Sequence, residues 1–331
     1  MPGAGHFAAR LYTTALLLAL ALCFGLSQSH AADYPERAIT LIVPSPPGGG
    51  TDTAWRIIAS ELGEELRQTI VVENRPGASG NIGAAAVAKA EPDGYTLLAL
   101  ISSHVINPHL LTQVPYDLER DFVPISRVVT VPGVLISHPS LGAHDLKELI
   151  ALARAHPGKI TFGSAGVGST SHLIMEMLAI RAGVKLVHVP YRGTAPALAD
   201  VLGNHVDLMV PDLSIGIANI RDNRLRAYGV TSADRSPSAP EIPTLAEAGL
   251  PDFEALQWFG LAAPARTPRP IIDKLHAAVM RTLGDPDIKA RLLKEAMTPA
   301  PSTSPDEFAA FMRAEGSKWA KVIEDANIAA Q

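Results

Sequence analysis

A glycine-rich loop near the amino terminus carries the first residues that can bind a ligand. The loop contains Pro44-Ser45-Pro46-Pro47-Gly48-Gly49-Gly50-Thr51-Asp52 and separates a short apolar run from a longer amphipathic one. Successive glycines leave backbone N–H groups open to approach, and the start of a helix places the positive end of the peptide dipoles beside them. Such a loop can bind a carboxylate or a phosphate without a lysine. A tight turn in which Thr51 or Asp52 caps the helix is the alternative interpretation.

A second loop of the same kind lies between Phe162 and His172. Its sequence is Gly163-Ser164-Ala165-Gly166-Val167-Gly168-Ser169-Thr170-Ser171, so hydroxyl groups accompany the open backbone. The glycine spacing is similar to that of a P-loop, but Ser169 stands where a phosphate-binding lysine is required, which excludes a nucleotide site. Phe162 likewise stands where the serine elbow of a hydrolase requires glycine. His172 lies in the first turn of a predicted helix, where capping, packing and ligand contact all remain open.

Three shorter segments add polar groups at comparable positions. These are Ser102-Ser103-His104 after a predicted strand, Tyr191-Arg192-Gly193-Thr194 before a predicted helix, and Asp212 after another predicted strand. Ligands of open parallel sheets bind at the carboxyl ends of the strands. Arg192 can pair with a carboxylate, although a long charged side chain more often lies in solvent. Asp212 can accept a hydrogen bond from a hydroxyl or amino group of a ligand, or cap the helix that follows it.

No set of residues in the sequence predicts catalysis or a cofactor. The 11 histidines include no H-E-x-x-H motif or comparable metal-ligand spacing, and the carboxylates are scattered mainly along predicted helix surfaces. The first loop is not a dinucleotide fingerprint, because Thr53 occupies the position of the third glycine. We therefore expect no catalytic residue, no metal and no cofactor, in a protein that is not an enzyme. An exported hydrolase that uses a serine of the second loop is the alternative, and it lacks a general base.

The loops lie within an alternation of short apolar runs and amphipathic segments. Strands are predicted over residues 39–43, 70–72, 96–101, 159–162, 185–189 and 206–210, and helices over residues 51–66, 84–90, 146–155, 172–182 and 195–202. This alternation predicts mostly parallel sheets with helices on both faces.

The order of the segments further predicts two lobes. A β-rich stretch over residues 122–136 separates two sets of alternating elements, and we expect it and residues 257–262 to cross between the lobes. The helices after residue 270 are expected to pack back on the first lobe. We therefore predict an α/β protein with residues 32–131 and 256–331 in the first lobe and residues 132–255 in the second.

The first 31 residues have the order of a secretory signal peptide. Arg10 is followed by an apolar run over residues 11–24 and by a small-x-small cleavage site, Ser29-His30-Ala31. The apolar run is too short to cross a bilayer, which takes about 20 residues. Acylation of Cys23, the only cysteine, is the lipoprotein alternative, but Leu22 is bulkier than the small residue usual before such a cysteine. We expect export to the periplasm and a mature chain without thiols.

The net charge of the chain indicates which classes of partner it can bind. The chain has 28 lysines and arginines against 33 aspartates and glutamates, a net charge of −5, and no basic run. A mildly acidic chain of this kind argues against nucleic acid as a partner. We expect a monomer that binds a small molecule.

Several motifs together resemble the substrate-binding receptors of tripartite tricarboxylate transporters, the Bug family. The motifs are Pro44-x-x-Pro47-Gly48-Gly49-x-x-Asp52, Asn74-Arg75-Pro76-Gly77-Ala78-x-Gly80, Pro92-Asp93-Gly94-Tyr95-Thr96-Leu97, Val189-Pro190-Tyr191-Arg192-Gly193, Pro243-Thr244-Leu245-Ala246-Glu247-Ala248-Gly249 and Trp258-Phe259-Gly260-Leu261. The resemblance runs from about Pro35 to the end of the chain. It implies a type II periplasmic-binding-protein fold, in which two lobes close on the ligand like a Venus flytrap.

The resemblance also implies the ligand class and the binding residues. Members of the family bind small carboxylates, such as citrate, other dicarboxylates, acidic amino acids or aromatic acids. Carried over by position, and with the serines after residue 101 added, the ligand-binding residues are Ser45, Pro47, Gly48, Thr51, Asp52, Ser102, Ser103, Ser164, Gly168, Ser169, Thr170, Thr194 and Asp212. Ser45 departs from the aromatic residue often found there, which implies a more polar or roomier pocket. The segment from Asn74 to Gly80 is interpreted as a structural turn.

The partners implied by the resemblance are the small and large membrane subunits of a transporter. A ligand-dependent sensor that presents its closed form to a signalling protein is the alternative, because the fold and the pocket would be the same.

Overall fold

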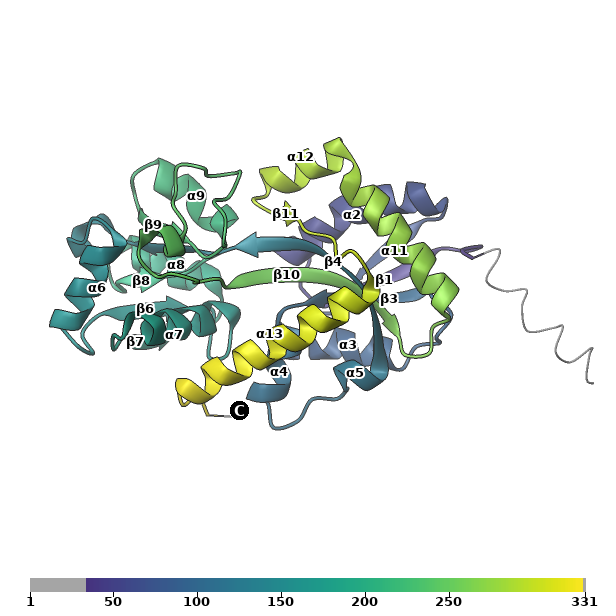
Figure 1. Cartoon of the computed structure of the whole chain (residues 1–331), viewed down its shortest axis with the longest axis horizontal. Helices are drawn as coiled ribbons and strands as arrows, with labels where there is room; N and C mark the ends of the chain where they lie inside the picture. Colours follow the sequence, from purple (N-terminus) through teal and green to yellow (C-terminus); the bar gives the residue numbers. More distant parts are fainter. Residues whose placement is uncertain (1–33, 330–331) are drawn as a thin grey trace, which may run out of the picture.

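A computed structural model describes residues 34–329. The predicted signal peptide and Cys23 lie outside the described residues. Two lobes lie side by side along the long axis of the molecule, and β4 (Phe122–Pro132) and β10 (Leu256–Pro264) run between them (Figure 1). Within residues 34–329, none of the helices is both long and apolar enough to cross a membrane.

The first lobe is built on a six-stranded sheet with the strand order β11-β4-β10-β3-β1-β2. Its other strands are β1 (Ile39–Val43), β2 (Ile70–Asn74), β3 (Thr96–Ile101) and β11 (Thr298–Pro299). β1 pairs in parallel with β2 and β3, whereas β10 runs antiparallel to both β3 and β4. β11 is antiparallel to β4 at the edge.

Helices cover both faces of this sheet because side chains alternate between its faces. On one face, Leu97 and Ala99 of β3 pack in a core with α2 (Gly50–Leu66), α11 (Arg269–Gly284) and α12 (Pro286–Lys294). On the other face, Leu98 and Leu100 pack in a second core with α3 (Asn81–Ala88), α4 (Ser103–Leu110) and α13 (Pro305–Asp325). Short helices η1 (Ala78–Gly80) and α5 (Leu118–Asp121) complete the lobe.

The second lobe is built on a five-stranded sheet with the strand order β7-β6-β8-β5-β9. The strands are β5 (Val134–Ser137), β6 (Thr161–Ser164), β7 (Val187–Pro190), β8 (Leu208–Met209) and β9 (Arg226–Val230). α8 (Thr194–Leu202) and α9 (Leu213–Arg221) share a core with one face, and α6 (Leu146–Ala155) and α7 (Thr170–Ala182) share a core with the other. The remaining short elements are η2 (Pro139–Leu141) and α10 (Leu245–Ala248).

The predicted two-lobe α/β architecture is confirmed, but both sheets are mixed rather than mostly parallel. β6 is parallel to β7 and β8, while β5 is antiparallel to β8 and β9. Every antiparallel pair in the two sheets includes β4, β5 or β10. These are the strands that carry the chain between the lobes, so they enter each sheet against the direction of the β-α-β strands already there. The two crossings were predicted, and their effect on strand direction was not.

Gly133 lies at the point where the first crossing passes from one sheet to the other, between β4 and β5. Its N–H donates to Thr231 Oγ1 at 2.9 Å, and the N–H of Val134 donates to the carbonyl of Pro211 at 3.0 Å. A Cβ at Gly133 would lie 2.6 Å from Cγ1 of Val210. The crossing therefore needs a residue without a side chain where it meets the second lobe.

The carboxy-terminal helix α13 reaches beyond the first lobe, where it was expected to pack. It lies against β4 and α4 and also contacts α7 of the second sheet, along the course seen in Figure 1. Trp258 and Trp319 are fully buried, and both indole N–H groups donate to Glu315. The helix thus joins the cores of the two lobes.

Candidate functional site

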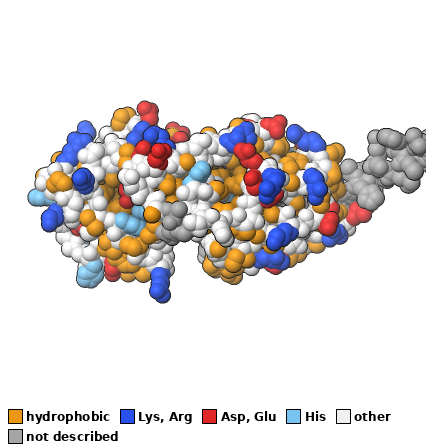
Figure 2. Space-filling model, turned by 90° about the horizontal axis from the view of Figure 1, so that it is seen from below, with side chains coloured by type: hydrophobic (Ala, Val, Ile, Leu, Met, Phe, Trp, Pro, Cys, Tyr) orange, Lys and Arg blue, Asp and Glu red, His pale blue; other side chains and the backbone are white. Residues whose placement is uncertain are grey.

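In each sheet, the predicted ligand loops lie at the edge formed by the carboxyl ends of the parallel strands. The first loop follows β1 and the segment from Ser102 follows β3, which is the parallel neighbour of β1. In the second lobe, the loops that follow β6, β7 and β8 are likewise carried by neighbouring parallel strands. The carboxyl ends of parallel neighbours lie at one edge of a sheet. Each lobe therefore gathers its polar loops at one edge, and the molecule narrows between the lobes (Figure 2).

Asp52 organises the first loop from within. Its carboxylate accepts hydrogen bonds from the N–H of Gly48 at 2.8 Å, from Asn74 Nδ2 at 2.9 Å and from Arg56 Nε at 2.9 Å. Asn74 Nδ2 also donates to the carbonyl of Ser45 at 3.0 Å. Asp52 is 3% exposed. Its side chain therefore fixes the loop between Ser45 and Gly48 to the end of β2.

The pKa of Asp52 reflects these contacts. Burial by itself raises the pKa of a carboxyl group, but the hydrogen bonds from Arg56, Gly48 and Asn74 outweigh burial and hold the pKa of Asp52 below its ordinary value. The carboxylate is therefore charged at neutral pH. Neither Asp52 nor Thr51 is the N-cap of α2, because Gly49 occupies that position without a side-chain bond, so the capping alternative is wrong.

Backbone N–H groups at the first turns of several helices stay open. Among the described residues, no protein acceptor lies on the N–H groups of Gly50 and Thr51 in α2, nor on those of Thr170 and Ser171 in α7. The same holds for Thr194 at the start of α8. Helix starts leave these donors without intrahelical partners, and the peptide dipoles point their positive ends toward them. Such donors can bind an anion.

Serines shape the second loop by bonding to its own backbone. Ser164 is fully buried, and its hydroxyl bonds to Gly166 and lies 2.6 Å from Nε2 of His188. Ser169 is the N-cap of α7, where its hydroxyl accepts from the N–H of His172 and donates to the carbonyl of Gly166 at 2.7 Å. Ser164 therefore supports the loop from the core side, away from solvent.

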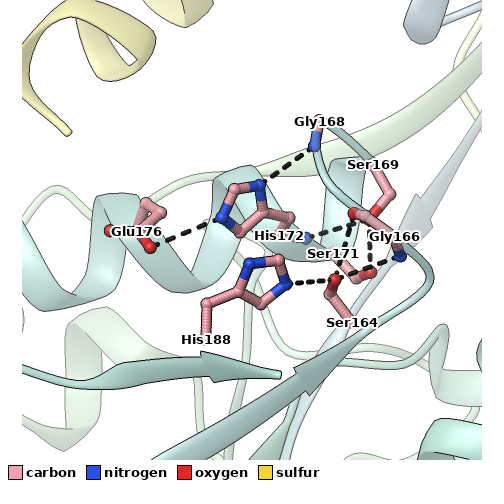
Figure 3. A network of polar contacts seen from close by, with 8 residues as sticks. All are labelled: Ser164, Gly166, Gly168, Ser169, Ser171, His172, Glu176 and His188. Carbon is pink, nitrogen blue, oxygen red and sulfur yellow. Dashed lines mark hydrogen bonds and ion pairs between the residues drawn. The ribbon is translucent and has the colours of Figure 1, made fainter. Parts of the chain in front are cut away.

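Two histidines lie behind the second loop. His172 from α7 and His188 from β7 stack with ring centroids 3.8 Å apart (Figure 3). Burial, followed by the neighbouring His172, lowers the pKa of His188 to about 4. His188 is therefore neutral at physiological pH, and its Nε2 shares a hydrogen bond with the Ser164 hydroxyl.

Asp212 links the second lobe to the second crossing. Gln257 Nε2 of β10 donates to Asp212 Oδ1 at 2.7 Å, and no side-chain bond of Asp212 caps α9. Burial raises the pKa of Asp212 to about 6. Asp212 thus occupies the N-cap position of α9, as the capping alternative predicted, but it caps the helix with its backbone carbonyl and leaves its side chain to Gln257. Trp258, the next residue of β10, accepts the N–H of Ser102.

A second contact between the lobes involves Gly168. Its φ is +73°, and a Cβ on this residue would lie 2.7 Å from Cδ1 of Leu110 at the end of α4. Because α4 belongs to the first lobe, the second loop touches that lobe directly. With the contact between Asp212 and Gln257, this places the polar edge of the second lobe next to the first.

The other predicted site residues differ in their exposure and in the hydrogen bonds that they already make within the protein. Ser45 has a buried hydroxyl for which the described residues offer no hydrogen-bond partner, and Pro47 is exposed. Ser102 is buried with its N–H bonded to the carbonyl of Trp258, and the Ser103 hydroxyl donates to the carbonyl of Ser79. Arg192 is exposed, as is usual for a long charged side chain.

Three residues that shape this region were not singled out from the sequence. The sequence predicted Asn74 only as part of a turn, and it predicted His188 and Gln257 only as parts of strands. For Asn74 and Gln257, the signal is a polar side chain at the end of, or within, an otherwise apolar strand. For His188, no feature of the sequence indicates its stacking partner.

A hollow of the first lobe lies apart from these loops. It has a volume of about 650 Å³ and is lined by α4, the start of β4 and α13, with Val105, Phe122 and Met312 in its walls. None of the predicted ligand-binding residues lines it.

Residues 54–328 match the family model described as the tripartite tricarboxylate transporter family receptor. The chain is 38% identical over 304 residues to protein BugT of Bordetella pertussis, which covers 91% of this chain and 93% of that protein. Among solved structures, it is similar to a Rhodopseudomonas palustris protein with adipate, at 35% identity and a TM-score of 0.79, covering 90% of this chain and all of the other. It is also similar to MatC from Rhodopseudomonas palustris with bound malate, at 33% identity and a TM-score of 0.73, covering 88% of this chain and all of the other.

These matches confirm the resemblance seen in the sequence motifs. The family consists of periplasmic solute-binding receptors and not of enzymes, as the sequence predicted. The chain belongs to the family of tripartite tricarboxylate transporter receptors.

Proposed function

We propose that the protein binds a short dicarboxylate between its two lobes and presents the closed form to the membrane subunits of a tripartite transporter. The observation that carries the proposal is the set of open N–H groups at the starts of α2 and α7, one in each lobe. Helix starts of this kind bind carboxylates. Adipate and malate in the two similar proteins support a dicarboxylate as the ligand class.

In this proposal, one carboxylate binds the backbone of the first loop. The N–H groups of Gly50 and Thr51 supply the donors, and the unpartnered hydroxyl of Ser45 is a further group that a ligand or a bridging water can satisfy. Gly48 and Asp52 act mainly on the shape of the loop, because they bond to each other. Pro47, which has no N–H group, can offer a carboxylate only apolar contact.

The second lobe supplies the opposing half of the site. Thr170 and Thr194 offer open N–H groups and hydroxyls at helix starts, while Ser164, Gly168 and Ser169 hold the loop that presents them. Asp212 repels a carboxylate when it is charged, so we assign it to a hydroxyl or amino group of the ligand. Ser102 and Ser103, next to Gln257 in β10, complete the wall on the first lobe.

The division into lobes and the location belong to the same proposal. Residues 32–131 with 256–331 form one lobe and residues 132–255 the other, a division supported by the membership of the two sheets and by Gly133 at the first crossing. Residues 1–31 are proposed to direct the chain to the periplasm before removal. Binding of a transporter rather than a sensor is proposed from the family to which the chain belongs.

A thermal-shift screen of the mature protein against dicarboxylates, tricarboxylates and amino acids, followed by calorimetry, tests the ligand class. A ligand present at about 100 times its Kd stabilises the folded state by about 2.7 kcal/mol, which is a shift of several degrees for a chain of this size. The protein must first be freed of carried-over ligand by unfolding and refolding. If malate, adipate and the other carboxylates all leave the melting temperature unchanged, the proposal fails.

Gly49→Val tests the place of the site. Gly49 has an ordinary extended backbone (φ −79°, ψ 166°), and a Cβ there meets only the carbonyl of Pro46 at 3.5 Å, so the fold tolerates the change. The added side chain obstructs the approach to the N–H groups of α2, and we expect Kd to rise at least tenfold. Gly284→Val is the matched control, because Gly284 ends α11 with nothing within 4 Å of its Cβ position. Equal affinity in both variants would move the site away from the first loop.

A further inference from the structure

A stack of three rings lies behind the second loop. His188 stacks on His172 at 3.8 Å between ring centroids and on Phe162 at 4.9 Å, with interplanar angles of 15° and 18°. The rings come from β7, α7 and β6, so they join the three elements that surround the loop. Figure 3 shows the two imidazoles. His172 is 4% exposed. A buried imidazole in direct contact with a partly buried one at a ligand loop calls for a role beyond filling space.

The hydrogen bonds of His172 fix which nitrogen of the neutral ring carries the proton. The backbone N–H of Gly168 donates to Nδ1 at 3.0 Å. A backbone N–H can only donate, so Nδ1 carries no proton, and the proton of the neutral ring is on Nε2. Nε2 lies 3.5 Å from Oε1 of Glu176 one turn further along α7. The ring is thus oriented at both nitrogens, by a carboxylate on one side and by the loop on the other.

The loop residue that His172 holds is the residue that touches the first lobe. Gly168 has a positive φ of 73°, and Leu110 Cδ1 would lie 2.7 Å from a Cβ placed on it. Two residues further on, Thr170 begins α7 with its N–H open toward the proposed ligand. One imidazole therefore sets both the contact between the lobes and the start of the helix that offers donors to the ligand.

We propose that neutral His172 is a positioning residue, which holds Gly168 against Leu110 and so couples the ligand loop of the second lobe to closure on the first. The proposal rests on the function proposed above. His188 supports the ring of His172 from one face and secures Ser164 at the other end of the loop. His172 itself does not touch the ligand in this account.

In this proposal, ligand binding depends on the acceptor at Nδ1 of His172. A donor at this position would face the Gly168 N–H and break the bond that holds the loop. We therefore expect the affinity to fall when Nδ1 can no longer accept this hydrogen bond.

The test compares His172→Asn with His172→Phe. The asparagine oxygen lies near the position of Nδ1 and keeps an acceptor that does not titrate, whereas phenylalanine keeps the stack and removes the acceptor. With malate or adipate as the probe, Kd should rise about tenfold in the phenylalanine variant, the effect of one lost hydrogen bond, and stay within about twofold of the unchanged protein in the asparagine variant. His156→Asn at the exposed end of α6 is the control.

A second readout does not depend on the ligand. In the ligand-free protein, the amide of Gly168 should exchange with solvent faster in His172→Phe than in His172→Asn, as followed by NMR. If the phenylalanine variant does not fold, the asparagine variant carries the test, because its Gly168 exchange and its Kd should both match those of the unchanged protein. If no probe binds, the proposed function fails, while the amide exchange still tests the coupling. The coupling is refuted if the asparagine and phenylalanine variants bind the ligand with equal affinity. It is also refuted if the Gly168 amide exchanges at the same rate in both variants.

Discussion

Replacing Asp52 by alanine should both destabilise the protein and weaken ligand binding. The carboxylate accepts from the N–H of Gly48, from Asn74 and from Arg56, and it is almost fully buried. Removing the carboxylate leaves the Gly48 and Asn74 donors without an acceptor, at about 1–3 kcal/mol each where water cannot enter. The contact to Arg56 adds little, because the arginine is half exposed and its charge is screened by solvent. We expect a total loss of about 3 kcal/mol in the free energy of unfolding.

Urea unfolding measures this loss directly. With a slope of about 3 kcal/mol/M, the midpoint should fall by about 1 M, and Asp234→Ala on the exposed loop after β9 should leave it unchanged. Because folding lowers the pKa of Asp52, its contribution is fully present above the unfolded value of about 3.9 and is lost as the pH falls through the folded value. The two midpoints should therefore converge below about pH 4. A variant as stable as the unchanged protein at pH 7 would refute the role assigned to Asp52.

Two further predictions concern the crossings between the lobes. Gly133→Ala should destabilise the protein by about 1–3 kcal/mol in urea unfolding, since the new methyl group would lie 2.6 Å from Val210, whereas an unchanged midpoint would show that the crossing can shift freely. Asp212→Asn should gain stability relative to the unchanged protein as the pH rises from about 4 to 7, because burial raises the folded pKa of Asp212 to about 6 and the charged form is the disfavoured one. Parallel stability curves for the two proteins over that range would contradict the burial of this carboxyl group.

The elements of the fold followed well from local patterns in the sequence. The strand over residues 96–101 was predicted with its observed bounds, because its apolar run is short and flanked by polar residues on both sides. The helix from residue 51 to 66 was displaced by only one residue at its start. Short-range periodicity decides such elements. The direction of the crossing strands depends on how the lobes are joined, which local periodicity does not contain.

The sequence located the loops of the candidate site but did not predict the contacts between their residues. The glycine loops were found because glycine and hydroxyl residues at a strand end are a local signal. The roles of single residues were predicted less well. Ser164 and Asp52 were predicted to bind the ligand, but both are buried and support their loops from inside. The stack of His172 on His188 requires α7 and β7 to be brought together by the sheet, and the bond between Asp212 and Gln257 joins segments from opposite lobes. Such pairs depend on tertiary structure alone.

A crystal structure of the mature protein with malate or adipate bound would show which groups hold the ligand. We expect one carboxylate within hydrogen-bond distance of the N–H groups of Gly50 and Thr51, with the rest of the ligand reaching the start of α7 at Thr170. A ligand held instead by an arginine or lysine side chain, or bound in the hollow beside α13, would contradict this expectation.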